Sequence, residues 1–209
     1  MRAKFKKRNI LEFIFFIYLI SHSGLLSQSS LLYRSQHAGN AFNFKKGSSV
    51  SLRSLTLRHG LMLGLGGIAD LAEYSDHSKK IIANEFNFLV PGRYMKWKWI
   101  HPQKEIWSWT RFDELVNFAQ RNSQQVKGHT IIWHRSLPPY MEEGKFNWKD
   151  FEDHIIRLMS RFKKHKTLDG KKLIFAWDVV NEAIGDLNMY GRIGFRETIF
   201  KKNLGEDYV

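Results

Sequence analysis

The sequence contains no cysteine, and this absence removes two kinds of structure. Without thiols the chain can form neither disulfide bonds nor metal sites built from thiolate ligands. The absence leaves the cellular compartment open, because exported proteins need not carry disulfides. With 43% hydrophobic and 14% aromatic residues, the 209-residue chain still has the material for a substantial core.

Acidic residues are scarce beside basic ones: 20 Asp and Glu stand against 33 Lys and Arg, a formal net charge of +13. Five of the basic residues and one acidic residue lie in 1–23, which leaves 28 against 19 in the remainder. A basic surface can attract nucleic acid, a membrane or an acidic polysaccharide. The charges are interspersed, however, and no basic helix or nucleic-acid motif is present. We therefore expect a solvated basic surface and no nucleic-acid partner.

A hydrophobic run long enough for a comfortable membrane span is also lacking. The apolar stretch from Ile10 to Ile20 follows a basic segment, is interrupted only by Glu12, and precedes the small residues Ser21 and Ser23. This pattern is typical of an export signal. We predict a cleaved signal over 1–23, a secreted or periplasmic protein, and no stable membrane span afterwards. An uncleaved anchor or a mistranslated leader is the alternative, because Glu12 weakens the apolar region.

Residues 24–51 are rich in Ser, Gly, Asn and Gln, and we interpret them as a linker or N-terminal arm. From residue 52 onward the pattern alternates between short apolar runs and amphipathic segments. Predicted strands cover 61–66, 87–90, 126–133 and 173–180. One predicted helix covers 76–86, with Ser75 or Asp76 as its cap. A second begins at Thr110, with Asp113 three residues on as in a capping box, and a third is capped by Asn147, with Asp150 three residues on. The predicted apolar face of the third helix consists of Trp148, Phe151, Ile155, Met159 and Phe162. Such alternation predicts an α/β fold with a parallel sheet and helical crossovers.

The fourth predicted strand ends in Asn181 and Glu182, and polar side chains at the carboxyl end of a parallel strand are where chemistry is usually placed. A carboxylic acid there, partly desolvated by Trp177, can act as a general acid near neutral pH. The alternative is that Glu182 caps the following helix or is simply solvated.

Three short motifs stand out: Trp177–Ala183 (W-D-V-V-N-E-A), Gly128–His134 (G-H-T-I-I-W-H) with Leu137-Pro138, and Met95–Trp97 (M-K-W) with Pro102. Together they resemble the motifs of the glycoside hydrolase family 10 xylanases. They occur in the family's order, and the resemblance runs from about residue 52 to 209, the front half of that family's domain. It implies about the first four βα units of a (β/α)8 TIM barrel over 52–209 and a retaining endo-1,4-β-xylanase activity on xylan. That chemistry needs no metal and no organic cofactor.

The resemblance also implies roles for five residues. Glu182 matches the acid/base, and Asn181 matches the asparagine beside it, whose amide can bond a sugar 2-hydroxyl. Lys96, His129 and Trp133 match residues that contact sugar, while His134 is assigned such a contact only weakly. The family's nucleophile is a glutamate on the seventh strand. The 209 residues reach only the fourth βα unit, so none of them is assigned that role.

The sequence departs from the family pattern beside Lys96. Where the family has Glu and Asn before M-K-W, this chain has Gly92 and Arg93, so a carboxylate acceptor is lost and a cation is gained. Ser136 stands where the family has a glutamine. These changes predict altered or weaker sugar binding on this side.

Two other functions remain open at this point. The missing nucleophile favours a catalytically inactive remnant or a weak xylan-binding half-barrel, and the open strand edges of half a barrel favour self-association. A glycine-rich segment, Gly64–Ala69, fits the outline of a dinucleotide site. A turn that packs a barrel explains it equally well, and no acidic residue follows the second strand convincingly. A zinc site is not expected, because the helical spacing and a third ligand are lacking.

Overall fold

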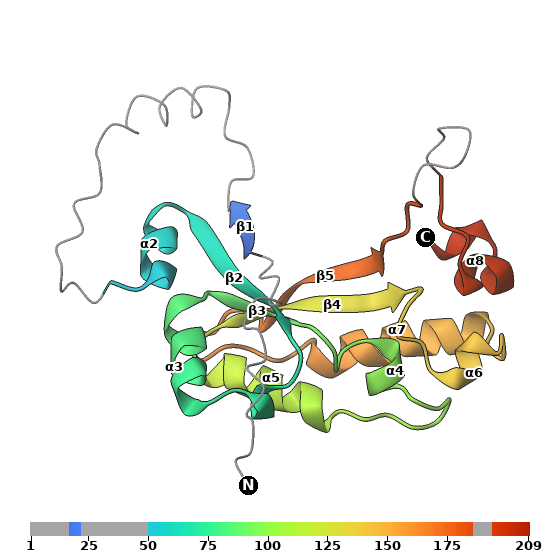
Figure 1. Ribbon diagram of the computed structural model, residues 1–209, viewed down its shortest axis with the longest axis horizontal. Helices are drawn as coiled ribbons and strands as arrows, with labels where there is room; N and C mark the ends of the chain where they lie inside the picture. Colours follow the sequence, from blue (N-terminus) through green and yellow to red (C-terminus); the bar gives the residue numbers. More distant parts are fainter. Residues whose placement is uncertain (1–16, 22–49, 186–193) are drawn as a thin grey trace, which may run out of the picture.

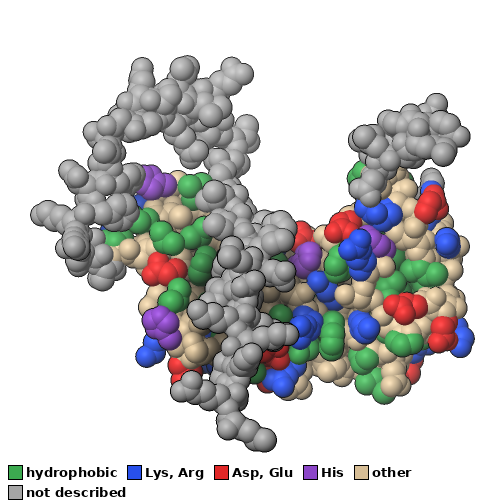
Figure 2. All heavy atoms as spheres, viewed as in Figure 1, with side chains coloured by type: hydrophobic (Ala, Val, Ile, Leu, Met, Phe, Trp, Pro, Cys, Tyr) green, Lys and Arg blue, Asp and Glu red, His purple; other side chains and the backbone are tan. Residues whose placement is uncertain are grey.

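The computed structural model describes residues 17–21, 50–185 and 194–209 (Figure 1). Most of the predicted signal, residues 1–16 and 22–23, lies outside the described residues, as does the predicted arm up to residue 49. Residues 17–21 of the predicted signal form a short strand, β1 (Ile17–Ser21). The division of the chain at residues 23 and 51 therefore stays a prediction. On the face shown in Figure 2, Lys and Arg side chains are interspersed with Asp and Glu, as expected from the sequence.

Five strands form one sheet in the order β1-β2-β3-β4-β5. Their bounds after β1 are β2 (Leu61–Ile68), β3 (Phe88–Pro91), β4 (Gln125–Trp133) and β5 (Ile174–Asn181). The strands β2 to β5 are parallel to their neighbours, whereas β1 lies antiparallel to β2, with Ile17 opposite Leu65 and Ser21 opposite Leu61. The predicted α/β class is confirmed, and the consecutive parallel order is that of the first half of a (β/α)8 barrel.

The three crossover helices lie on one side of the sheet (Figure 1). They are α3 (Asp76–Glu85), α5 (Thr110–Arg121) and α7 (Trp148–Phe162). The other helical segments were not predicted: α2 (Leu52–Arg58), η2 (Leu71–Glu73), α4 (Trp97–Ile100), α6 (Pro139–Glu142), α8 (Ile199–Leu204) and η3 (Glu206–Tyr208). None of the helices in the described ranges has the length and hydrophobicity needed to cross a membrane.

All three predicted helix starts are confirmed, but the capping box predicted at Thr110 and Asp113 is wrong. Ser75 caps α3, and Asn147 caps α7 in a reciprocal capping box with Asp150. At α5 the capping position is Trp109, which makes no side-chain bond to the helix, and Thr110 is already the first helical residue. The carboxylate of Asp113 is unavailable for a capping box, because it forms an ion pair with Arg161 of α7 at 2.5 Å.

The sheet is buried on both faces around β3, because consecutive strand side chains point in opposite directions. Leu89 packs into the large core between the sheet and the helices, whereas Phe88 and Val90 form a small cluster with Met62 and Phe175. On α7 the predicted apolar face was partly wrong. Trp148 and Met159 are exposed, and His154 and Leu158 are buried in their place.

A stack of aromatic rings fixes α4 against α7. The Trp97 ring lies parallel to the fully buried His154 ring at 3.7 Å, and the Trp107 ring covers His101 at 4.1 Å. The two histidines meet through their Nδ1 atoms at 3.3 Å, and Trp97 Nε1 donates a 2.8 Å hydrogen bond to the hydroxyl of Tyr140. Because Trp97 follows Lys96 in the chain, this stack also fixes the position of the lysine backbone.

The histidine pair predicts a loss of stability in acid. Burial lowers the pKa of His154 well below its ordinary value of 6.5, and the neighbouring His101 adds to this effect. Burial also lowers the pKa of His101. A histidine whose pKa is lower in the folded state than in the unfolded state binds more protons when the chain unfolds. Stability is therefore complete above about pH 6.5 and falls below it, by at most about 1.4 kcal/mol per pH unit for His154.

Urea unfolding between pH 8 and pH 5 measures this slope. We expect His154→Gln to flatten it whatever its effect at pH 8, and His77→Gln, which alters an exposed histidine of α3, to leave it unchanged. Equal slopes for the native chain and His154→Gln would show that another group controls the acid transition.

Candidate active site

All five residues predicted to form the site line one cavity of about 300 Å³. Its walls are Gly66, Gly67, Val90, Pro91, Gly92, Lys96, His129, Trp133, Asn181 and Glu182. These residues come from the ends of β2 and β3, the segment before α4, and the strands β4 and β5. Parallel strands bring their carboxyl ends to the same edge of a sheet, which explains why segments so far apart in sequence meet here.

The register of β4 against β5 places residues of two motifs side by side. His129 lies opposite Asp178, and Trp133 lies opposite Asn181. His129 lies in the middle of β4, which continues to Trp133. The pairing is irregular between His129 and Ile132, and this irregularity changes the alternation of side chains near the cavity.

Asp178 holds the histidine of this pair, and the sequence reasoning missed it. His129 Nδ1 lies 3.0 Å from one carboxylate oxygen, and Lys127 Nζ lies 2.7 Å from the other. Partial burial acts to raise the pKa of Asp178, but the hydrogen bonds from His129 and Lys127 outweigh it and hold the pKa below its ordinary value. The bond to Nδ1 orients the imidazole ring, so that Nε2 is the free nitrogen. The sequence did offer a signal for this contact: an aspartate and a histidine lie on two strands that were predicted to be neighbours.

Glu182 follows β5 with its side chain 44% exposed. Its Oε2 accepts a 3.0 Å hydrogen bond from Trp133 Nε1 and lies 3.7 Å from His134 Nε2. The backbone of Glu182 has a φ of +54°, a left-handed conformation that non-glycine residues adopt at a cost. That conformation lets the chain turn at the end of the strand, with the carboxylate beside the indole.

Lys96 also contacts Trp133. Its Nζ lies 4.5 Å from the centre of the Trp133 ring. Burial lowers the pKa of Lys96, the charge of Glu182 opposes that shift, and the charge of Arg93 adds to it. The pKa of His134 is lowered by burial and by Arg196, so this ring is held in its neutral form at neutral pH. The site thus combines one carboxylate, one ammonium group and one indole.

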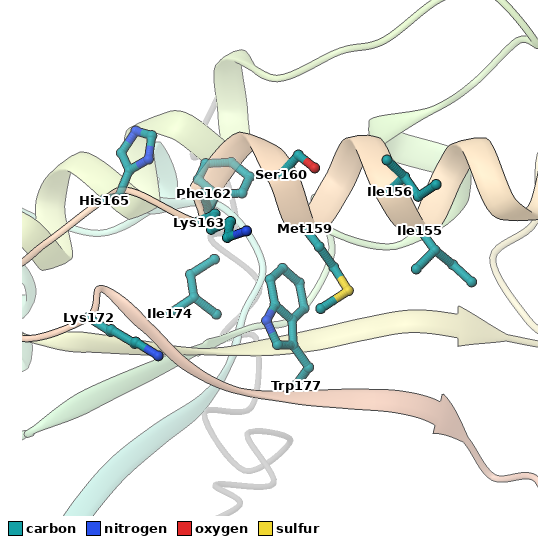
Figure 3. Close-up of a pocket in the computed structure, with 10 residues that line it drawn as sticks. All are labelled: Ile155, Ile156, Met159, Ser160, Phe162, Lys163, His165, Lys172, Ile174 and Trp177. Carbon is teal, nitrogen blue, oxygen red and sulfur yellow. The ribbon is translucent and has the colours of Figure 1, made fainter.

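The predicted desolvation of Glu182 by Trp177 is wrong, because the indole of Trp177 lies elsewhere. Trp177 lines a separate groove of about 420 Å³ between α7 and β5 (Figure 3). Its ring points toward α7 and lies beside Met159 and Ile174. A Cβ atom at Gly128 would come within 2.3 Å of this ring, so the tryptophan packs directly on the backbone of β4. Trp133 is the residue that contacts Glu182.

Two alternative site types have no support in the described part of the chain. Gly64–Ile68 belong to strand β2, so these glycines do not form a loop at a helix N-terminus as a dinucleotide site requires. Gly66 and Gly67 line the candidate site instead. Within 17–21, 50–185 and 194–209, no three histidine or acidic side chains cluster as metal ligands.

Comparison with known proteins gives a family match that covers most of the chain. Residues 51–209 match the family Glycosyl hydrolase family 10. Endo-1,4-beta-xylanase B of Thermotoga neapolitana is 31% identical over 166 residues, which are 77% of this chain and 44% of the relative. Beta-1,4-xylanase of Dictyoglomus thermophilum is 37% identical over 113 residues, 53% of this chain and 30% of the relative.

Solved structures give the same result at the level of the fold. Xylanase 10B of Thermotoga petrophila RKU-1, crystallised with xylobiose, superposes with a TM-score of 0.66 at 31% identity, covering 78% of this chain and 48% of that one. Native xylanase 10B of Thermotoga maritima gives 0.65 at 32% identity, covering 76% and 47%. This chain therefore spans less than half the length of the relatives it matches.

Proposed function

Because the chain belongs to glycosyl hydrolase family 10, we propose that it supplies the acid/base half of a retaining endo-1,4-β-xylanase. The substrate is xylan or a related β-1,4-linked polysaccharide, and hydrolysis proceeds without a metal or an organic cofactor. Xylobiose is the ligand of one of the similar solved structures, and a short β-1,4-linked xylose oligomer is the ligand we assign to the cavity here.

The observation that carries this proposal is the convergence of Lys96, His129, Trp133, Asn181 and Glu182 on one cavity. Three separate sequence motifs supply these five residues. The group has the chemistry that a sugar requires. Ammonium, imidazole and amide groups can bond hydroxyls, and an indole face suits the apolar face of a pyranose ring.

In this proposal Glu182 gives a proton to the leaving glycosidic oxygen and later removes one from the attacking water. Asn181, the adjacent residue, bonds the sugar 2-hydroxyl. Asp178 orients His129, whose free Nε2 then faces a sugar hydroxyl. Trp133 fixes the carboxylate of Glu182 through its 3.0 Å hydrogen bond, and Lys96 lies over the Trp133 ring.

A retaining mechanism needs a second carboxylate about 5–5.5 Å from the first. Glu182 is the only acidic residue among the side chains that line the cavity. The nucleophile of the complete site must therefore come from outside the residues described here. This observation favours the second candidate function, a half-barrel that binds xylan weakly without cleaving it.

The same half-barrel geometry supports a proposal of self-association. Among the described strands, β5 pairs only with β4, and the groove beside it exposes apolar side chains such as Ile156 and Met159 (Figure 3). An unpaired strand edge beside an exposed apolar surface favours association with another chain. The partner we propose is a second copy of this chain. Sedimentation velocity that shows a single monomeric species across micromolar concentrations would count against it.

Export is proposed from the sequence pattern of residues 1–23, followed by removal of this segment outside the cytoplasm. N-terminal sequencing of the protein from an expressing cell measures this directly. A mature chain that starts near residue 24 supports export with cleavage, and an intact Met1 in the membrane fraction points to an uncleaved anchor.

Sugar binding tests the proposed function independently of catalysis. We expect the 209-residue chain to bind xylotriose weakly, with a Kd on the order of millimolar, because half of the site is present. Lys96→Met should weaken binding about tenfold, since it removes one charged hydrogen-bond donor. Chemical-shift titration measures both values. The matched control is Lys98→Met, an exposed lysine of α4. Absence of xylotriose binding, or equal effects of the two variants, would contradict the proposal.

A further inference from the structure

The wall of the cavity on the β3 side is bare backbone. Gly92 lines the cavity beside Gly66 and Gly67, and its amide donates a 2.6 Å hydrogen bond to the carbonyl of Ile68. A Cβ atom at Gly92 would come within 2.7 Å of the Gly67 carbonyl group, so this backbone has no room for a side chain. Position 92 therefore cannot provide a side-chain acceptor for a sugar hydroxyl.

Arg93, the residue after Gly92, has a charged guanidinium group on the β3 side of the cavity. Its guanidinium lies 5.6 Å from the centre of the Trp99 ring and 5.8 Å from that of Tyr94. Trp99 is 40% exposed, and the two rings meet edge to face at 5.5 Å. The hydroxyl of Tyr94 donates a 3.2 Å hydrogen bond to Asp70, which caps η2. The aromatic surface under the guanidinium is therefore fixed before any ligand arrives.

The ion pair of Arg93 is weak enough to be exchanged. Its Nη1 lies 3.8 Å from Glu73 Oε1, and both side chains are exposed, at 40% and 62%. An exposed pair at this separation contributes little to stability. A planar guanidinium prefers two parallel hydrogen bonds to one carboxylate, which Glu73 does not supply here.

Arg93 and the cavity also share an electrostatic field. The charge of Arg93 acts on Lys96, which lies inside the cavity, and disfavours its protonated form. The charge of Glu182 acts on Lys96 more strongly than that of Arg93 does, whereas Arg93 itself faces the exposed carboxylate of Glu73 at 3.8 Å. An anionic group on the ligand would compete with Glu73 for the guanidinium of Arg93.

We propose that Arg93 and Trp99 form a binding position for a uronic acid unit, carried by an oligosaccharide whose neutral units occupy the cavity. The inference rests on the proposed xylan-type function and names the substrate class: acidic rather than neutral chains. The sugar carboxylate replaces Glu73 on the guanidinium and makes the bidentate contact. The apolar face of the sugar ring lies against the exposed indole.

The test compares two ligands on the 209-residue chain: xylotriose and xylotriose bearing one glucuronic acid branch. The acidic ligand should bind about five- to tenfold more tightly at low salt, a gain of the size expected for one charge-assisted bidentate contact. The gain should shrink at 0.5 M NaCl. Arg93→Gln should bring the ratio of the two affinities close to one. Glu73→Gln should raise the ratio, because it removes the competing carboxylate.

Arg121→Gln is the matched control, since Arg121 is an exposed arginine at the end of α5. It should leave the ratio unchanged. If xylotriose binds and the acidic ligand binds no better, or if the ratio survives Arg93→Gln, this inference is wrong and the proposed function stands. If neither ligand binds, the proposed function fails and the inference fails with it.

Discussion

Purified residues 24–209 are expected to release reducing sugar from xylan at no more than trace rates, about 10⁴-fold or more below the intact Thermotoga neapolitana relative. The cavity contains one carboxylate, Glu182, and a retaining mechanism needs two. Without the nucleophile the covalent glycosyl intermediate cannot form. What remains is proton donation and positioning, which cannot complete the reaction.

Supplying the missing side of the barrel should reverse this deficit. We expect activity to appear when the chain is combined with the part of that relative beyond the segment it matches, either in trans or as a fusion. The measurement is initial-rate release of reducing ends from soluble xylan. Rates near those of the intact relative from residues 24–209 alone would overturn the expectation, because they would require a nucleophile within this chain.

In the complemented protein, Glu182→Gln should lower xylan hydrolysis by about 10²–10⁴-fold, the usual effect of losing general acid–base help. Glutamine keeps the shape of the side chain and still accepts the hydrogen bond from Trp133, but it cannot supply a proton to the leaving oxygen. The loss therefore depends on the leaving group. An activated aryl xyloside, whose phenolate departs unaided, should keep most of its first-step rate.

A pre-steady-state burst of the aryl leaving group measures that first step. The burst should persist in Glu182→Gln, with slow turnover afterwards. The control is Glu143→Gln, which alters an exposed glutamate paired with Lys145 and should affect neither step. If Glu182→Gln removes the burst while the protein stays folded, Glu182 is not the acid, and the assignment of its role is wrong.

Much of the fold was predictable because its signals are local. Strands β2 to β5 were each expected within two residues at either end, because apolar runs rich in β-branched residues mark buried strands. The capping box at Asn147 was read from spacing alone. The short helices α2, α4 and α6 were not predicted, because a helix of one or two turns has too few residues to show a hydrophobic periodicity.

Sequence motifs predicted which five residues line the cavity, but not the residues that contact them. Glu182, Asn181, His129, Trp133 and Lys96 meet as expected. Asp178 was passed over, although it holds His129, because its importance depends on the register between two strands. The indole beside Glu182 was assigned to Trp177, the nearer tryptophan in sequence, whereas Trp133 makes the contact from the neighbouring strand.

The sequence by itself determined the α/β alternation, the family and the identity of the five cavity residues, since each is encoded in short-range patterns of hydrophobicity and motif. Only the tertiary structure decided which groups touch: the bond from Trp133 to Glu182, the clamp of Asp178 on His129, the buried histidine pair, and the place of Arg93 over Trp99. Such contacts depend on strand register and on the packing of helices against the sheet. A shift of one residue in register turns a side chain to the opposite face, so no local pattern can specify its partner.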